Sequence, residues 1–229
     1  MIVAIDGPAG SGKSTVARAL AAREGLTYLD TGAMYRAVTC AALERGVSAS
    51  DADAVAELAR TLPLSLTTGA SGQQVLVDGE DRTAEIRTPE VDANVSAVAA
   101  NPAVREAMVS LQRKLAEGAN VVAEGRDIGT VVFPAAEVKV FLTADPAARA
   151  HRRAVQRAGG DTATGEAAAT DAAQERAVED ELIARDKADS SRTASPLRPA
   201  DDARHLDSTG LSVDEVCDLI VGLMREVRS

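Results

Sequence analysis

Ile2-Val-Ala-Ile-Asp-Gly-Pro-Ala-Gly-Ser-Gly-Lys-Ser-Thr-Val16 is the stretch of this 229-residue chain that decides its fold. Its first four residues form a continuous apolar run, the pattern of a short strand that is buried on both faces. Gly7 to Ser14 then match GxxxxGK[ST], and residues 13–24 have the periodicity of a helix that ends at Gly25. A buried strand, a glycine-rich loop and a helix in this order predict a P-loop within an α/β fold.

The loop provides the groups that bind a nucleoside triphosphate. Its glycines let backbone N–H groups converge on phosphate oxygens, and the helix N-terminus adds a favourable dipole. The Lys13 ammonium would reach the β- and γ-phosphates, and the Ser14 hydroxyl would bind Mg²⁺. An ordinary glycine-rich turn is the alternative, which the complete motif in its context disfavours. The predicted ATP-binding residues are Gly7, Pro8, Ala9, Gly10, Ser11, Gly12, Lys13, Ser14 and Thr15.

Along the rest of the chain, short apolar runs alternate with helical patterns. Further strands are predicted at residues 27–29, 121–123, 138–142 and 204–207. Further helices are predicted at residues 33–45, 102–117, 174–189 and 213–227, and others begin at Pro89 and Pro146. Thr88 and Asn101 are the predicted caps of the helices that begin at Pro89 and Pro102. Thr31 is predicted to cap the helix at residues 33–45. The alternation predicts a parallel sheet with helices on both faces, a three-layer α/β/α fold.

Two stretches interrupt this pattern. Residues 63–86 contain strand-like runs at 64–67 and 74–77 and a turn at Asp78-Gly79, and they predict an inserted β-hairpin. Residues 158–171 are rich in Ala, Gly and Thr, and this low complexity predicts a mobile segment.

The composition argues against several classes of function. With no Trp, two Tyr and two Phe, the chain lacks stacking platforms for single-stranded nucleic acid. The net charge of −10 argues against binding to nucleic acid or to an anionic membrane. Cys40 and Cys217 form no CxxC pair, and there is no signal-peptide pattern or apolar run of ~18 residues. We therefore expect a soluble, cytoplasmic protein.

Charged residues near predicted strand ends and in a late helix are the candidates for a second binding site. Only four of the 25 basic residues are lysine, so a single arginine is weak evidence for a binding site. The position of each arginine in the predicted fold must show whether it belongs to a site. Arg126 and Asp127 follow the strand at 121–123, and ligands of parallel sheets bind beyond such carboxyl ends. A local Arg–Asp ion pair that closes the sheet is the structural alternative. Arg185, Asp189 and Arg192 lie at helical spacing in the late helix. Ion pairs within a solvated helix would explain this spacing equally well.

Five motifs, in the same order, resemble those of the bacterial cytidylate kinases: GPAGSGKST, LDTGAMYR, EIRTPEV, EGRDIGTVVFP and RDKADSSR. The resemblance covers nearly the whole chain and implies a P-loop fold of the nucleoside-monophosphate kinase type. It implies a core at residues 1–32, 98–150 and 193–229, and a monophosphate-binding lobe at 33–97 with a β insertion at 63–86. It also implies a helical lid at residues 151–192, which looks longer here than is usual for the family.

The resemblance further implies that Ser96, Arg105 and Asp127 read a cytosine base. Cytosine offers an amino donor at N4 and acceptors at N3 and O2, which suit a carboxylate or hydroxyl and an arginine respectively. Uracil presents the opposite pattern at N3 and position 4, and a mismatched polar site can cost about 10⁴–10⁵-fold in turnover. For Ser96, an exposed helix serine without a binding role remains the alternative.

The other implied roles concern the phosphate and the ribose. Arg36, Arg126 and Arg192 match phosphate-binding positions, and Arg185 and Asp189 match positions near the ribose. The full set predicted to bind CMP is Thr31, Tyr35, Arg36, Arg87, Ser96, Arg105, Arg126, Asp127, Arg185, Asp189 and Arg192. The predicted catalytic residues are Lys13, Arg126, Arg153, Arg185 and Arg192, with Arg152 as a further candidate.

The implied reaction is in-line transfer of the γ-phosphoryl group of ATP to CMP or dCMP, with Mg²⁺. The acceptor oxygen is already anionic near neutral pH, so positioning and charge stabilisation would replace a general base. We expect a monomer. Two alternatives stay open: another small-molecule P-loop kinase, for UMP or a non-nucleotide acceptor, and a nucleotide-binding module without turnover. The chain lacks the Asn-Lys-x-Asp run of GTPases and the apolar strand ending in Asp-Glu of motor ATPases.

Overall fold

A computed structural model describes residues 1–69, 72–160 and 168–228. The chain forms two compact units, a first unit of Met1–Tyr28 and Gly118–Ser229 and a second unit of Leu29–Glu117. The boundary falls within the second strand, so the second unit is one continuous insertion into the first.

The first unit is built on a five-stranded sheet with the order β2-β6-β1-β7-β8. Its strands are β1 (Ile2–Asp6), β2 (Thr27–Asp30), β6 (Val121–Gly125), β7 (Val138–Thr143) and β8 (Arg204–Asp207). Strand β1 pairs in parallel with β6 and β7, and β7 pairs in parallel with β8. The central position of β1 explains its continuous apolar run, because both of its faces are covered.

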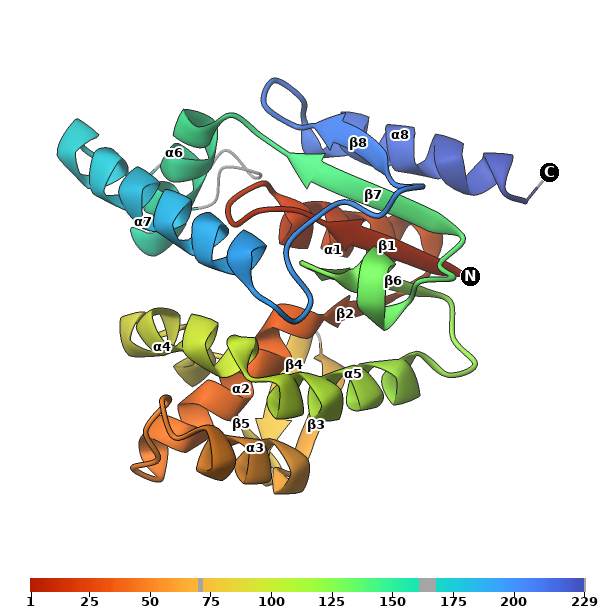
Figure 1. Cartoon of the computed structure of the whole chain (residues 1–229). Coiled ribbons are helices and arrows are strands. Elements are labelled where there is room, and N and C mark those ends of the chain that lie inside the picture. The colour runs from red at the N-terminus through yellow and green to blue at the C-terminus, as the bar shows by residue number, and fades with distance from the viewer. Residues whose placement is uncertain (70–71, 161–167, 229) are drawn as a thin grey trace. The chain divides into compact units, whose positions relative to one another are not determined.

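Two helices cover one face of this sheet, as Figure 1 shows. They are α1 (Lys13–Glu24) and α8 (Val213–Glu226). Leu20 and Ile220 pack with Val3, Ile5 and Val140 in one apolar cluster whose members are almost fully buried. The parallel sheet with flanking helices confirms the predicted α/β P-loop architecture.

Two further helices of the first unit lie side by side in Figure 1. They are α6 (Pro146–Arg157) and α7 (Ala172–Ser191), and they fall within or near the predicted lid. Ala150 and Ala154 of α6 pack against Val178 and Leu182 of α7. Half of the predicted mobile segment at residues 158–171 lies outside the described residues, since 161–167 are not described, and its mobility stays a prediction.

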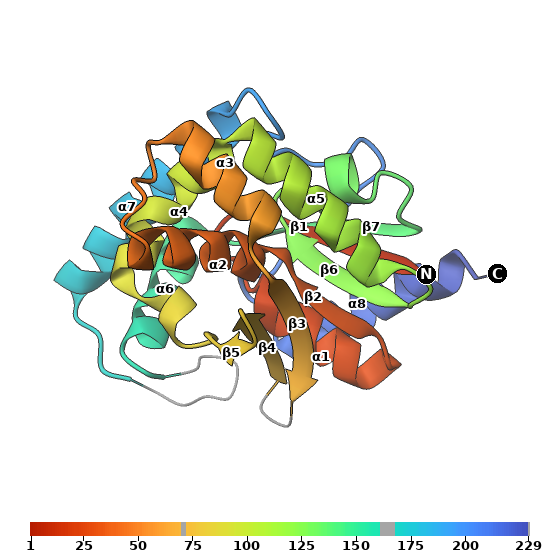
Figure 2. The ribbon, with the colours of Figure 1, turned by 90° about the horizontal axis from the view of Figure 1, so that it is seen from below.

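The second unit combines helices with a small antiparallel sheet, as seen in Figure 2. Its elements are α2 (Thr31–Glu44), α3 (Ala52–Thr61), β3 (Leu64–Gly69), β4 (Gly72–Val77), β5 (Glu80–Asp81), η1 (Glu85–Arg87), α4 (Pro89–Ala100) and α5 (Pro102–Ala116). Strands β3 and β4 form the predicted hairpin, and the short β5 adds a third strand after the turn at Asp78 and Gly79. Positive φ angles of 54° and 81° at these two residues suit a tight hairpin turn.

Two features of the second unit differ from the sequence predictions. Thr31 does not cap α2, because the Asp30 carboxylate accepts the bond from the Ala33 N–H and Thr31 is already the first helical residue. Helix α3, capped by Asp51, was not predicted. By contrast, Thr88 and Asn101 cap the proline-started helices α4 and α5 as expected.

The bounds of the two units differ from those of the implied core, since residues 29–32 and 98–117 lie in the second unit. Helix α5 was assigned to the core, yet it belongs to the second unit, where it packs against α3 and α4. The physical reason is its apolar face, since Val104 and Met108 are almost completely buried. The subdivision into core, monophosphate-binding lobe and lid otherwise stays a prediction.

Candidate active site

The phosphate loop has a backbone that favours glycine at several positions. Gly10 and Gly12 have φ angles of 77° and 89°, in the left-handed region that disfavours side chains. A Cβ on Gly7 would lie 2.0 Å from the carbonyl oxygen of Leu142, so β7 leaves no room for a side chain. The loop follows β1 and begins α1, which is the context that the motif requires.

Lys13 lies buried in this loop, with 6% of its surface exposed. Its Nζ donates to the Pro8 carbonyl oxygen at 2.6 Å and to the Ser11 hydroxyl at 3.4 Å. Burial, and after it the nearby Arg126 guanidinium, lower the pKa of Lys13 to about 7, while Glu124 and Asp6 act in the opposite direction. The ammonium therefore lacks full charge compensation, and a bound polyanion would supply it.

Asp6, at the end of β1, is a site residue that the sequence analysis missed. Its two carboxylate oxygens accept from the backbone N–H groups of Ile128 and Gly129, each at 2.7 Å. Burial raises the pKa of Asp6 to about 6, against the opposing effect of those two hydrogen bonds. An acidic residue directly after a fully buried strand, next to a P-loop, was the signal that could have identified it.

These hydrogen bonds hold the turn that follows β6, in which Asp127 precedes a π-helical turn, η2 (Ile128–Val132). The Asp127 carbonyl oxygen accepts from the N–H groups of Val131 and Val132, at 2.8 and 3.1 Å. The Asp127 side chain is 4% exposed. Single π-helical turns are rare and concentrate at functional sites. The carboxylate is thus buried and fixed at the carboxyl end of a central strand.

Arg126 forms its ion pair with a distant residue. Its Nε donates to Asp189 Oδ2 at 3.0 Å, and Asp189 lies near the C-terminal end of α7. Arg192 also contacts this residue, through Nε to the Asp189 carbonyl oxygen at 3.2 Å and through a terminal nitrogen 3.4 Å from Oδ1. Asp189 is 5% exposed. One buried carboxylate therefore serves two of the predicted phosphate-binding arginines.

The remaining predicted residues of the first unit lie on α6 and α7. Arg153 donates to Gln156 Oε1 at 2.7 Å, and Arg185 is half-buried on α7, four residues before Asp189. The first unit thus contains the phosphate loop, Arg126, Asp127, Arg153, Arg185, Asp189 and Arg192.

In the second unit, Arg36 is held by a carboxylate of its own. Its guanidinium donates to Asp92 Oδ1 at 2.5 Å and to the Ile86 carbonyl oxygen at 3.3 Å. Both side chains of this ion pair are 13% exposed. A terminal nitrogen of Arg87 lies 3.4 Å from Asp30 Oδ2. Asp30 also caps α2.

Arg105, predicted to read the base, is buried against an aromatic ring. Its guanidinium carbon lies 5.3 Å from the centre of the Tyr35 ring, a cation–π distance, and a terminal nitrogen donates to the Ala99 carbonyl oxygen at 3.2 Å. Ser96 is half-buried on α4, and Thr31 is buried at the start of α2. The second unit thus contains Thr31, Tyr35, Arg36, Arg87, Ser96 and Arg105.

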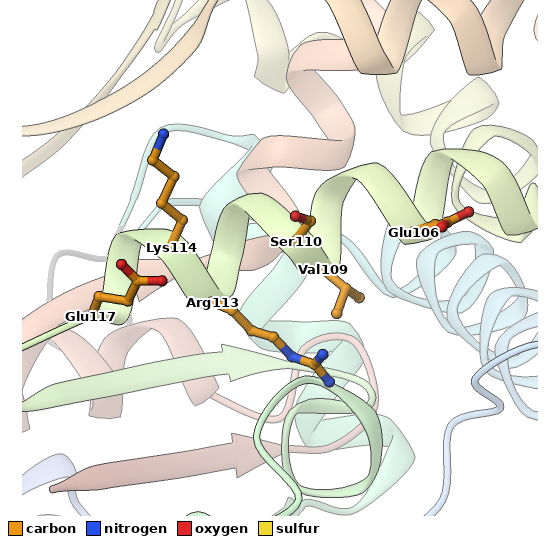
Figure 3. A pocket seen from close by; sticks show the side chains of 6 residues that line it. All are labelled: Glu106, Val109, Ser110, Arg113, Lys114 and Glu117. Carbon is orange, nitrogen blue, oxygen red and sulfur yellow. The ribbon is translucent and has the colours of Figure 1, made fainter.

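A surface depression on α5 contains none of these residues. Glu106, Val109, Ser110, Arg113, Lys114 and Glu117 line it. Figure 3 shows that their side chains spread along the helix and do not converge on one point. The depression therefore lacks the convergent polar groups of a binding site.

Across the described ranges, no three His, Cys, Asp or Glu side chains gather closely enough to bind a metal ion. In the same ranges, no helix combines the length and the apolar character needed to cross a membrane.

Comparison with known proteins relates the chain to one family. The model of the family described as cytidylate kinase matches residues 3–226. A cytidylate kinase of Rhodococcus opacus is 49% identical over 227 residues, covering 99% of this chain and 95% of the relative. A cytidylate kinase of Corynebacterium efficiens is 49% identical over 224 residues, covering 97% and 94%.

A bifunctional pantoate ligase/cytidylate kinase of a Synechococcus strain is 50% identical over 226 residues, covering 98% of this chain. The chain spans 45% of that relative, about half its length. Among solved structures, an uncharacterized protein from Eubacterium ventriosum superimposes with a TM-score of 0.50 at 15% identity, with 98% of both chains covered. This last likeness shows the fold alone.

Proposed function

The chain belongs to the cytidylate kinase family, and from this premise we propose that it transfers the γ-phosphoryl group of ATP to CMP and dCMP. A complete phosphate loop and a buried Asp127 at the end of a central strand of the same unit are what this reaction requires. The buried Asp127 carboxylate is the observation that carries the choice of base, because it suits the N4 amino group of cytosine.

The proposed roles follow from the contacts of each residue. Lys13 would bind the β- and γ-phosphates of ATP, which would restore the charge that its buried position disfavours. Arg126 and Arg192, both held by Asp189, would bind the transferred and accepting phosphates. Because the acceptor phosphate is already an anion, no residue needs to remove a proton before transfer.

Base recognition would use Asp127, Arg105 and Ser96. Asp127 would accept from the cytosine amino group, and Arg105, oriented by the Tyr35 ring, would donate to N3 or O2. Ser96 would add a hydroxyl. Arg36 and Arg87 would contact the acceptor phosphate, and Arg185 would lie near the ribose.

We propose Mg²⁺ as the cation that accompanies ATP. The Ser14 hydroxyl is exposed at the first turn of α1, where it is free to bind the ion. Mg²⁺ usually keeps several waters and substrate phosphate oxygens as ligands, so one protein hydroxyl fits a site of this kind. When bound, the ion would neutralise phosphate charge.

The remaining proposals concern the whole protein. We propose a monomer in the cytoplasm that binds small nucleotides and binds neither nucleic acid nor membranes. The net charge of −10 supports the last point, since it repels polyanionic surfaces. Light scattering after size exclusion, with and without added DNA, measures both the mass and any binding.

The acceptor profile tests the proposed function most directly. ADP release with ATP and Mg²⁺ should be fastest with CMP and dCMP, and slower with UMP by at least about 10²-fold. Faster turnover of UMP than of CMP, or no turnover of any acceptor, would contradict the proposal.

Replacing Asp127 by Asn tests the base-reading role. The amide cannot replace both acceptor oxygens, so kcat/KM for CMP should fall about 10²-fold or more while the Kd for ATP changes less than about threefold. An equal loss of CMP turnover and ATP binding would show that Asp127 has only a structural role.

A further inference from the structure

Side chains from α6 and α7 hold the phosphate loop at Ala9. Asp186 Oδ1 accepts from the Ala9 backbone N–H at 3.2 Å, and Arg149 donates to the Ala9 carbonyl oxygen at 2.9 Å. Arg149 also donates to Asp186 Oδ2 at 2.5 Å. The three residues therefore close a ring of contacts that engages both backbone polar groups of Ala9. We call it the Ala9 clamp.

The clamp is partly buried and closely packed. The Arg149 side chain is 8% exposed and that of Asp186 is 19% exposed. A Cβ on Gly10 would lie 3.0 Å from the Arg149 carbonyl oxygen, so the backbone of α6 touches the loop directly. Ala9 also packs against the apolar cluster that joins α6 to α7. Charge-assisted hydrogen bonds shielded from water are stronger and more directional than exposed ones.

A second attachment lies one turn further along α6. Arg152 donates to the Ser208 hydroxyl at 3.0 Å and to its carbonyl oxygen at 2.7 Å. The Ser208 hydroxyl in turn lies 3.0 Å from the Ser11 carbonyl oxygen and 3.1 Å from that of Thr143. Helix α6 is therefore connected to the phosphate loop at Ala9 and, through Ser208, at Ser11.

We propose that Arg149 and Asp186 are positioning residues, which hold the loop from Ala9 to Lys13 in its phosphate-binding conformation. The N–H groups that follow Ala9 can converge on phosphate oxygens only if this backbone is fixed before binding. A loop that must be ordered during binding loses affinity, because the entropy of ordering is then subtracted from the interaction free energy. The inference rests on the proposed function only in that the loop binds ATP.

The same two helices provide a matched control. Arg157 of α6 and Glu181 of α7 form an exposed ion pair with an N–O distance of 2.7 Å and side chains 41% and 58% exposed. This pair crosses between α6 and α7 as the Arg149–Asp186 pair does, and its polar contacts do not include the loop. Replacing Arg157 by Met therefore removes an α6–α7 ion pair and leaves the clamp intact.

Direct binding of ATP, measured by calorimetry without an acceptor, tests the proposal. Arg149→Met should raise the Kd for ATP at least about tenfold, and Asp186→Asn about three- to tenfold, because each removes part of one clamp. The double variant should show a less than additive loss, since the two residues contact each other and both contact Ala9. Arg157→Met should stay within about twofold of the unchanged protein.

Hydrogen exchange separates positioning from a general structural role. In the absence of nucleotide, the amides from Gly10 to Ser14 should exchange faster in Asp186→Asn, with no such change in Arg157→Met. A lower Tm with an unchanged Kd for ATP and unchanged loop exchange would overturn the proposal. If Arg149→Met does not fold, Asp186→Asn, which keeps the side-chain shape, decides alone.

The calorimetric test of ATP binding does not depend on which acceptor the protein phosphorylates. ATP binding would still reveal the clamp if the protein phosphorylated UMP or another acceptor. Conversely, unchanged ATP binding in both variants would overturn the clamp and leave the acceptor profile of the unchanged protein intact.

Discussion

The two units hold their predicted phosphate-binding arginines in different ways. In the first unit, Arg126 and Arg192 share the single carboxylate of Asp189. In the second unit, Arg36 has its own carboxylate, Asp92. In the first unit one carboxylate therefore orients two guanidiniums, whereas in the second unit the carboxylate of Asp92 orients the guanidinium of Arg36.

Removing each carboxylate is the strongest test of this difference. Asp189→Ala should lower kcat/KM for CMP about 100-fold, equivalent to about 2.7 kcal/mol, because two guanidiniums lose their orientation and repel each other. Asp92→Ala should cost about tenfold or less, because Arg36 keeps its bond to the Ile86 carbonyl oxygen. Steady-state kinetics with CMP varied at saturating ATP measures both effects.

Asp189→Asn serves as the control for shape. The amide keeps one acceptor for the Arg126 Nε–H, so its effect should lie between those of the unchanged protein and Asp189→Ala. Equal losses for Asp189→Ala and Asp92→Ala would show that sharing a carboxylate has no functional consequence.

The two units also differ in a buried acid. The pKa of Asp6 in the first unit is raised, and no described aspartate of the second unit has a raised pKa. Burial raises the pKa of Asp6 from 3.8 to about 6, so the folded protein holds this proton more tightly than the unfolded chain. Its contribution to stability is complete below pH 3.8 and is lost as the pH rises through 6. The free energy of unfolding that Asp6 contributes below pH 3.8 exceeds its contribution above pH 6 by roughly 3 kcal/mol.

Urea unfolding of the unchanged protein and of Asp6→Asn between pH 4 and 7 measures this contribution. The difference in free energy of unfolding between the two proteins should change by roughly 2.4 kcal/mol over that range. A pH-independent difference would mean that Asp6 titrates alike in the folded and unfolded states.

The smallest predicted effect is a proton taken up on nucleotide binding. Burial and the nearby Arg126 lower the pKa of Lys13 to about 7, so the amine is mostly neutral at pH 8. Phosphate oxygens favour the charged form, and ATP binding at pH 8 should therefore take up as much as about one proton. Calorimetry in two buffers of different ionisation enthalpy measures the uptake.

Lys13→Arg provides the matched comparison, because a guanidinium stays charged at this pH. If that variant still binds ATP and takes up the same number of protons, the uptake does not come from Lys13.

Local patterns explain why much of the fold could be predicted. The buried run of β1 and the glycine that follows α1 are short-range signals, and both elements begin where the sequence indicated. The proline-started helices α4 and α5 were identified by the caps Thr88 and Asn101. Helix α3 was not among the predicted helices, although Asp51 caps it.

The residues of the candidate site could largely be predicted from the sequence, but their ion-pair partners could not. Spacing marked Arg126 and Asp189 as separate candidates, yet no pattern indicated that they form an ion pair across 63 positions of sequence. The local alternative for Arg126 was Asp127, its neighbour in the chain. In the folded chain Arg126 pairs with Asp189, because α7 brings that carboxylate to the guanidinium.

The sequence by itself determined the phosphate loop, the central buried strand, the helix starts and the family, since these depend on neighbouring residues, on periodicity and on motif order. Only the tertiary structure decided that Asp6 holds the turn at Ile128, and that Arg149 and Asp186 hold Ala9. Each of these contacts joins residues more than a hundred positions apart. Their geometry is set by the packing of the sheet and helices, and no local pattern encodes it.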